Sequence, residues 1–185
     1  MKTDDSHGTE RLAQNRTGGP GKRQRRPQWT IVSGGQTGAD RAALDFALEH
    51  DLPHDGWCPR GRLAEDGAIP SRYQLRESTS ARYPQRTQWN VRDSDVTVLL
   101  TLATDLRGGT GLTARLAERL GKPWLHLCRD RGESPAALGQ RLGKFVLQHQ
   151  AQRINIAGPR ASHAPEIGPF VRAVLVSAFI SCRPA

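Results

Sequence analysis

The chain has 185 residues, with 27 lysine and arginine against 18 aspartate and glutamate residues and a formal net charge of +9 at pH 7. This length suits one domain with a full core plus terminal extensions. No apolar run approaches the roughly 20 residues of a membrane-spanning helix, and three widely spaced cysteines (Cys58, Cys128 and Cys182) predict no disulfide framework. We therefore expect a cytoplasmic protein without a membrane span.

Residues 1–28 differ in composition from the rest of the chain. They hold almost no large apolar side chain, and they include the basic run Lys22–Arg26. We expect a disordered basic tail here, followed by one ligand-binding domain over residues 29–185. Such charge runs are usually solvated; the alternative is weak, non-specific contact with nucleic acid or an anionic surface.

Strand patterns alternate with helical patterns along the remaining chain. The expected strands are 29–33, 54–57, 95–102, 124–128 and 153–157, and the expected helices are 37–50, 83–93, 112–120, 134–149 and 165–181. Strand 95–102 is almost continuously apolar, which is typical of a central strand covered on both faces. The alternation predicts an α/β fold: a three-layer, Rossmann-like, doubly wound and mainly parallel sheet in a single domain.

The segment Ser33–Asp40 reads Ser-Gly-Gly-Gln-Thr-Gly-Ala-Asp and joins an expected strand to an expected helix. Glycines let a backbone approach an anion closely, and the first N–H groups of a helix lack intrahelical partners. The spacing matches neither a G-x-G-x-x-G fingerprint nor a P-loop. We therefore expect a phosphorylated ligand, but not ATP in a Walker site.

A second glycine loop, Gly108-Gly109-Thr110, also follows an expected strand and leads into a helix. In doubly wound sheets, loops of this kind meet at the carboxyl ends of the strands, where ligands bind. The two loops together predict a two-sided phosphate clamp, with charge supplied by Arg60, Arg62 or Arg160. Asp40 has two interpretations: it complements the helix dipole or pairs with Arg41, or it holds a hydroxyl or amide of the ligand.

Residues 58–82 fit no periodic pattern, and a loop of this length is usually functional or disordered. Its adjacent acids Glu65 and Asp66 are the candidate catalytic carboxylates, although adjacent acids in a loop are more often simply solvated. His126 and Cys128 share one face of an expected strand, but no second pair of ligands accompanies them, so we expect no metal site.

These segments together resemble the family of molybdenum cofactor carrier proteins, in order and in register from about Trp29 onward. The matching motifs include Ser33–Arg41, Gly56–Arg62, Ala64–Gly67, Arg86-Thr87, Gly108–Thr110 and Asn155–Arg160. The resemblance implies a Rossmann-like cytosolic oligomer, a dimer or tetramer, that carries or stores the molybdenum cofactor, a pterin phosphate, and delivers it to molybdoenzymes. The predicted ligand-binding residues are then Gly34, Gly35, Gln36, Thr37, Gly38, Asp40, Arg60, Arg62, Gly108, Gly109, Thr110 and Arg160.

The wider superfamily of this resemblance includes the Lonely-guy phosphoribohydrolases and the DNA-processing protein, so the alternative function is hydrolysis of a nucleotide or ADP-ribose derivative. The phosphoribohydrolases place a catalytic glutamate soon after a Pro-Gly-Gly-x-Gly-Thr run. Here Arg107 stands in place of the proline, and no acid follows before Glu118. The general acid or base that glycosidic cleavage needs is therefore missing from that position, and the sequence favours a carrier over a hydrolase.

Overall fold

The computed structural model describes residues 29–181, so the basic tail 1–28 and Cys182 lie outside the described residues. Five parallel strands form the main sheet in the order β2-β1-β9-β7-β8. Their bounds are β1 (Thr30–Val32), β2 (His54–Asp55), β7 (Val96–Thr101), β8 (Trp124–Cys128) and β9 (Arg153–Ala157). The last strand of the chain thus lies at the centre of the sheet, beside the first.

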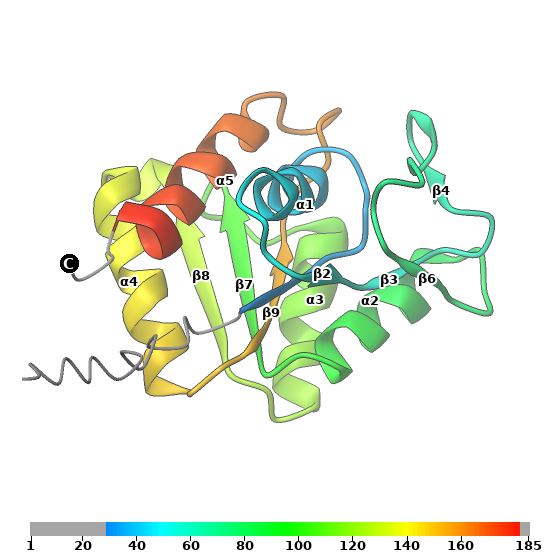
Figure 1. Cartoon of the computed structure of the whole chain (residues 1–185), viewed down its shortest axis with the longest axis horizontal. Coiled ribbons are helices and arrows are strands. Elements are labelled where there is room, and N and C mark those ends of the chain that lie inside the picture. Colours follow the sequence, from blue (N-terminus) through cyan, green and yellow to red (C-terminus); the bar gives the residue numbers. More distant parts are fainter. Residues whose placement is uncertain (1–28, 182–185) are drawn as a thin grey trace, which may run out of the picture.

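Helices cover both faces of this sheet (Figure 1). On one face, α5 (Ile167–Val176) packs against α1 (Ala39–Glu49) and α4 (Pro135–Gln148), and on the other α2 (Tyr83–Arg92) packs against α3 (Gly108–Arg119). This arrangement confirms the predicted three-layer, Rossmann-like α/β fold in a single domain. Within residues 29–181, every helix is too short or too polar to cross a lipid bilayer.

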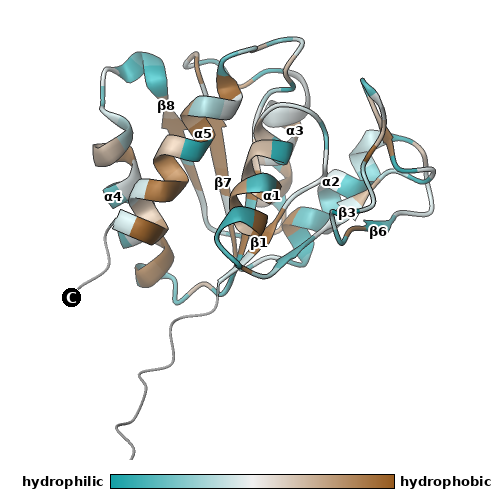
Figure 2. Ribbon diagram, turned by 45° about the horizontal axis from the view of Figure 1, so that its top comes forward, coloured by the Kyte–Doolittle hydropathy of each residue, from teal (hydrophilic) through white to brown (hydrophobic). Residues whose placement is uncertain are grey.

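The core explains why β7 was the easiest strand to recognise. All six of its residues are buried, because helices lie on both faces of this strand. The larger apolar cluster lies between the sheet and α1, α4 and α5, whose apolar faces turn inward (Figure 2). A smaller cluster, built on Val91, Leu116 and Ala117, joins α2 to α3.

Residues 57–77 form an ordered arm at one side of the domain, as expected of a functional loop (Figure 1). The arm contains four two-residue strands: β3 (Trp57–Cys58) pairs with β6 (Arg76–Glu77), and β4 (Leu63–Ala64) pairs with β5 (Gly67–Ala68). Its own small core holds the buried side chains Cys58, Ile69 and Tyr73 against Leu44 of α1. This packing fixes the position of the β4–β5 hairpin.

One predicted helix start was wrong by a full turn, and the predicted end of the same helix is confirmed. Helix α3 begins at Gly108 and not near residue 112, so its glycines form the first turn itself. Gly121 follows its last turn with φ +62°, the left-handed conformation expected after a helix. Helix α5 begins at Ile167 with Glu166 as N-cap, two residues after the predicted start at residue 165. A π-helix, Ser177–Ser181, continues α5.

Candidate functional site

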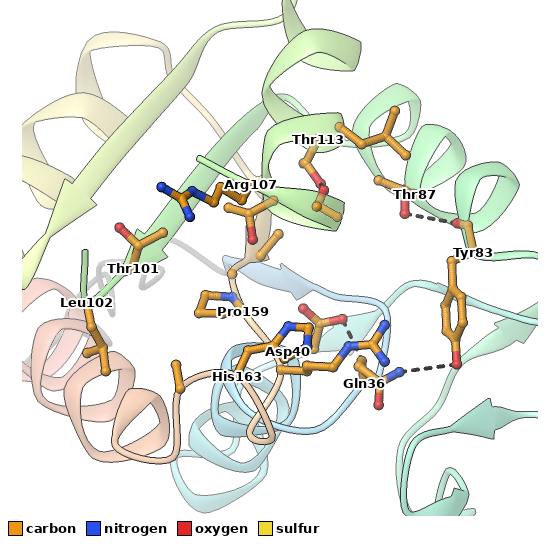
Figure 3. A pocket seen from close by; sticks show the side chains of 18 of the residues that line it. Gln36, Asp40, Tyr83, Thr87, Thr101, Leu102, Arg107, Thr113, Pro159 and His163 are labelled. Atoms are coloured by element: carbon orange, nitrogen blue, oxygen red, sulfur yellow. Dashed lines mark hydrogen bonds between the residues drawn. The ribbon is translucent and has the colours of Figure 1, made fainter. Parts of the chain in front are cut away.

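A cavity of about 1110 Å³ lies at the carboxyl edge of the sheet, where β7 and β9 end. Thr101 and Ala157, the last residues of these strands, belong to its lining. Its walls come from α2, the first turn of α3 and the segments that follow β1 and β9 (Figure 3). This is the position at which doubly wound sheets bind their ligands.

The first turn of α3 opens directly on this cavity. Gly108, Gly109 and Thr110 line it, and the first intrahelical bond of the turn is donated by Gly111 N to Arg107 O. Arg107, the N-cap residue, provides no side-chain hydrogen bond to the turn. An added Cβ at Gly108 or Gly109 would meet no atom within 4 Å. The turn therefore presents uncapped N–H groups and the positive end of a helix dipole to open space.

The segment after β1 is different, because three backbone donors of this loop and of the first turn of α1 are used within the protein. Gln36 N donates to Asp40 Oδ2 (3.3 Å), and Thr37 N donates to Gln36 Oε1 (3.0 Å). Ala39 N, in the first turn of α1, donates to Pro159 O (3.2 Å). This loop thus supplies the cavity with the side chains of Gln36 and Asp40 rather than with a row of free N–H groups.

Asp40 forms a buried ion pair with Arg86 of α2, with 3.1 Å between Arg86 Nη1 and Asp40 Oδ2. The Asp40 and Arg86 side chains are 6% and 13% exposed, respectively, and both residues line the cavity. Burial raises the pKa of the Asp40 carboxyl above its usual value, against the opposing effect of the Arg86 charge. Asp40 therefore combines parts of both interpretations: it is paired with an arginine, although not Arg41, and it faces the cavity.

Arg86 is one of the cavity residues that the predicted set lacked. A signal for it exists in the sequence, because Tyr83, Arg86, Thr87 and Asn90 repeat polar side chains at helical spacing on one face of α2. Thr87 and Asn90 are buried, which is uncommon for a polar helix face. Arg86 Nε is also buried and has no hydrogen-bond partner among the described residues.

Tyr83 and Arg160 form a further part of the cavity wall. The guanidinium carbons of Arg86 and Arg160 lie 5.7 Å and 5.5 Å from the centre of the Tyr83 ring, within the range of cation–π contact. Gln36 Nε2, from the loop after β1, donates to Tyr83 Oη of α2 (3.4 Å; Figure 3). The wall thus carries an aromatic ring, an amide and two guanidinium groups.

Half of the predicted ligand-binding residues line the cavity: Gln36, Asp40, Gly108, Gly109, Thr110 and Arg160. The other glycines of the first loop are at close contacts within the protein. A Cβ at Gly35 would approach Leu75 Cδ1 to 2.7 Å, and a Cβ at Gly38, where φ is +79°, would approach Pro159 O to 2.6 Å. Gly34 adjoins the Arg86 guanidinium. These glycines admit neighbouring groups of the chain itself.

The two predicted arginines of the arm do not line the cavity. Arg62 donates to four backbone oxygens of the arm, those of Ile69, Pro70, Tyr73 and Leu75, at distances of 2.9 to 3.2 Å. Arg60 is exposed, and its backbone N–H donates to Ser80 O. Arg62 therefore holds the arm together.

The two candidate catalytic carboxylates, Glu65 and Asp66, also lie outside the cavity lining. Glu65 accepts hydrogen bonds from Thr37 Oγ1 and from Ser162, and it is 3.6 Å from Arg160 Nη1. These hydrogen bonds lower the Glu65 pKa below its usual range. Asp66 forms a two-pronged ion pair with Arg41, which likewise lowers its pKa. The two acids bind the β4–β5 hairpin to the domain, with Thr37 as one anchor.

Each carboxylate in the cavity lining is already paired with an arginine. Asp40 pairs with Arg86, Asp105 with Arg107 (2.6 Å), and Glu166 with Arg129 (2.7 Å). His126, whose pKa burial lowers, is bound to Thr101 Oγ1 (2.7 Å) behind the lining. Among residues 29–181, no three metal-binding side chains converge. The acids of the lining are thus ion-paired, while the His163 imidazole also lines the cavity.

The comparisons with known proteins agree with this architecture. Residues 31–179 match the circularly permutated YpsA SLOG family, and the chain therefore belongs to that family. A crystal structure named as a "putative molybdenum carrier protein" from Syntrophus aciditrophicus is 46% identical in sequence, with a TM-score of 0.78. The match covers 80% of this chain and 93% of that chain. No curated protein matches the chain.

Proposed function

We propose that this member of the circularly permutated YpsA family binds a phosphorylated small molecule, with its phosphate at the first turn of α3. One observation carries the proposal: an uncapped helix start with two exposed glycines opens on a cavity of about 1110 Å³. Anions bind favourably at such helix starts, because several N–H groups and the helix dipole act together. The cavity is large enough for a ring system as well as the phosphate.

We further propose that the ligand is the molybdenum cofactor, held as cargo by a carrier or storage protein. The relative named as a molybdenum carrier supports this choice, because it shares 46% of its sequence over most of the chain. The residues fit such a cargo: α3 offers donors for a terminal phosphate, and Gln36, Arg86 and Arg160 offer polar groups for a pterin ring. Arg86 Nε is buried beside the cavity and has no hydrogen-bond partner among the described residues.

The test measures binding of isolated molybdenum cofactor to the purified chain. The bound cofactor is quantified by the fluorescence of its pterin after oxidation. Gly109→Asp should abolish binding, since its carboxylate would lie beside the phosphate in the open space at this position. Gly109→Asn is the matched control, because it has the same shape without the charge, and it should retain most of the affinity. Equal binding by Gly109→Asp and wild type would place the phosphate elsewhere.

The alternative, hydrolysis of a nucleotide or ADP-ribose derivative, has less support. Its candidate acids Glu65 and Asp66 bind the hairpin to the domain, and the acids of the cavity lining are ion-paired. Product formation from a panel of nucleotides and ADP-ribose, lost in Glu65→Gln or Asp66→Asn, would support it. Turnover that survives in both variants would exclude these two residues from catalysis.

A further inference from the structure

We propose that the Asp40–Arg86 pair selects the ring of the ligand by reading a 2-amino-4-oxopyrimidine edge, which pterins and guanine share. The inference rests on the proposed function, because it assumes that the ligand phosphate occupies the first turn of α3. It adds which residues recognise the ring, and by which edge, and it assigns a role to Arg86.

The pair lies across the cavity from the start of α3. In Figure 3, Asp40 and Gln36 lie on one side, while Arg107, the N-cap residue of α3, lies on the other. The cavity lining includes both groups of residues. A ligand with its phosphate at Gly109 therefore directs its far end toward Asp40 and Arg86.

The hydrogen bonds of the pair leave groups for a ligand. The bonds from Gln36 N and from Arg86 Nη1 both end on Asp40 Oδ2, at 3.3 Å and 3.1 Å. A guanidinium group carries five N–H donors, whereas Arg86 donates only this one bond among the described residues. The Gly34 N–H also contributes to holding the Asp40 carboxylate, while Asp40 Oδ1 accepts no side-chain hydrogen bond among the described residues. Both residues line the cavity, so Oδ1 and the remaining Arg86 N–H groups are the polar groups that the pair offers to a ligand.

This arrangement complements one heterocycle edge in particular. The 2-amino-4-oxopyrimidine edge presents a ring N–H and an amino group beside a carbonyl oxygen. Asp40 Oδ1 accepts from the ring N–H and the adjacent amino group, and a free N–H of the guanidinium donates to the carbonyl. Adenine presents an amino group where guanine has the carbonyl, and it would set a donor against Arg86. Hypoxanthine keeps the carbonyl but lacks the 2-amino group.

The cost of the pair argues for a role beyond stability. Buried ion pairs contribute little net stability compared with apolar residues of the same volume, because both charges lose their hydration. Here the chain also leaves Gly34 without a side chain, in contact with the guanidinium. A second, small chamber behind the pair is lined by Asn90, Thr113 and Asn155. The pair thus has polar side chains on this side as well.

The experiment compares GMP, IMP and AMP by calorimetry, because GMP and IMP differ only in the 2-amino group. We expect wild type to bind GMP about ten-fold or more tightly than IMP, since an unmatched buried acceptor costs about 1–3 kcal/mol. AMP should bind most weakly. Asp40→Asn should bring GMP and IMP closer together, while Arg86→Lys should weaken GMP and IMP alike and leave AMP little changed.

Several outcomes separate the inference from the proposed function. Equal affinities for GMP and IMP in wild type would overturn the inference, and so would binding of none of the three nucleotides. The wild-type comparison needs no variant, so it decides the question even if Asp40→Asn fails to fold. Gly109→Asp tests the phosphate site separately: if it leaves all three affinities unchanged, the proposed phosphate position is wrong whatever ring is preferred.

Discussion

The guanidinium group of Arg86 occupies the space that a side chain at Gly34 would fill: an ideal Cβ there would lie 1.6 Å from Arg86 Nη1. The Gly-Gly sequence after β1 is therefore explained at this position by an internal contact. Because Arg86 also pairs with Asp40, the absence of a side chain at residue 34 allows the charged pair at the end of the cavity.

The first prediction concerns Gly34→Ala. The added methyl group displaces the Arg86 guanidinium and breaks the buried pair, which should lower the free energy of unfolding by about 3 kcal/mol or more. Gly109→Ala is the matched control, because its Cβ meets nothing within 4 Å; the same exchange in a helix is neutral or slightly stabilising. Urea unfolding of both variants measures the difference, and equal stability would show that Arg86 moves aside at little cost.

The second prediction concerns Arg62, which donates to four backbone oxygens of the arm. Arg62→Lys removes the fork of donors that spans these oxygens, so about 2–3 kcal/mol of stability should be lost, at about 1 kcal/mol for each bond. Arg60→Lys, the same exchange at an exposed side chain of the same arm, should change little. Limited proteolysis within residues 59–78 should accelerate in Arg62→Lys only; comparable rates in both variants would contradict the bracing role.

Sequence patterns predicted the features that local interactions determine, and they missed those that depend on contacts between distant segments. Periodicity identified the five strands of the main sheet and the three-layer class, because β7 is buried on both sides and α1 to α5 each bury one face. The four short strands of the arm were not predicted. The cavity residues near Gly109 and Asp40 were predicted because a glycine turn and a helix start are local signals. The place of β9 between β1 and β7 is set by long-range pairing, which leaves no local pattern.

Arg62 was predicted to bind the ligand but holds the arm together, whereas Arg86 was not predicted and lines the cavity. The reason is physical. An arginine in a Gly- and Pro-rich loop suits both a phosphate and a set of backbone oxygens, and only the folded arm brings four oxygens to Arg62. Arg86 needs both Gly34 and Asp40 beside it, from a loop some fifty residues earlier. Polar spacing along α2 marked that face, but it did not reveal what the face contacts.

The third prediction concerns Glu65, which connects the β4–β5 hairpin to the segment after β9. Ser162 N donates to Glu65 Oε1 (3.2 Å), and Ser162 Oγ donates to Oε2 (2.6 Å). Glu65→Gln replaces one accepting oxygen with an amide donor and removes the charge near Arg160. Hydrogen exchange at Ser162 N should accelerate several-fold, while Ala39 N, bonded to Pro159 O, should keep its protection. Unchanged exchange at Ser162 would show that this contact does not fix the segment.

The final prediction concerns pH and the contact between Asp93, which follows α2, and Trp57 of β3. Asp93 binds Arg92 through both carboxylate oxygens, and its Oδ2 accepts from Trp57 Nε1 at 2.7 Å. The Arg92 hydrogen bonds, more than any other cause, lower the pKa of Asp93 to about 2 from an ordinary 3.8. Because the folded-state pKa lies below the unfolded one, the stabilisation is fully present above pH 3.8 and disappears as the pH falls toward 2.

Asp93→Asn should therefore be less stable than wild type near neutral pH, and the gap should close as the pH falls through this window. Trp57→Phe removes the indole donor but leaves the Arg92 bonds, so it should retain most of the pH-dependent difference. Urea unfolding at several pH values between neutrality and about pH 2 measures both, with the tryptophans that remain in each variant (Trp29, Trp89 and Trp124) as fluorescent reporters. A constant gap between Asp93→Asn and wild type across the window would mean that Asp93 titrates alike in the folded and unfolded chains.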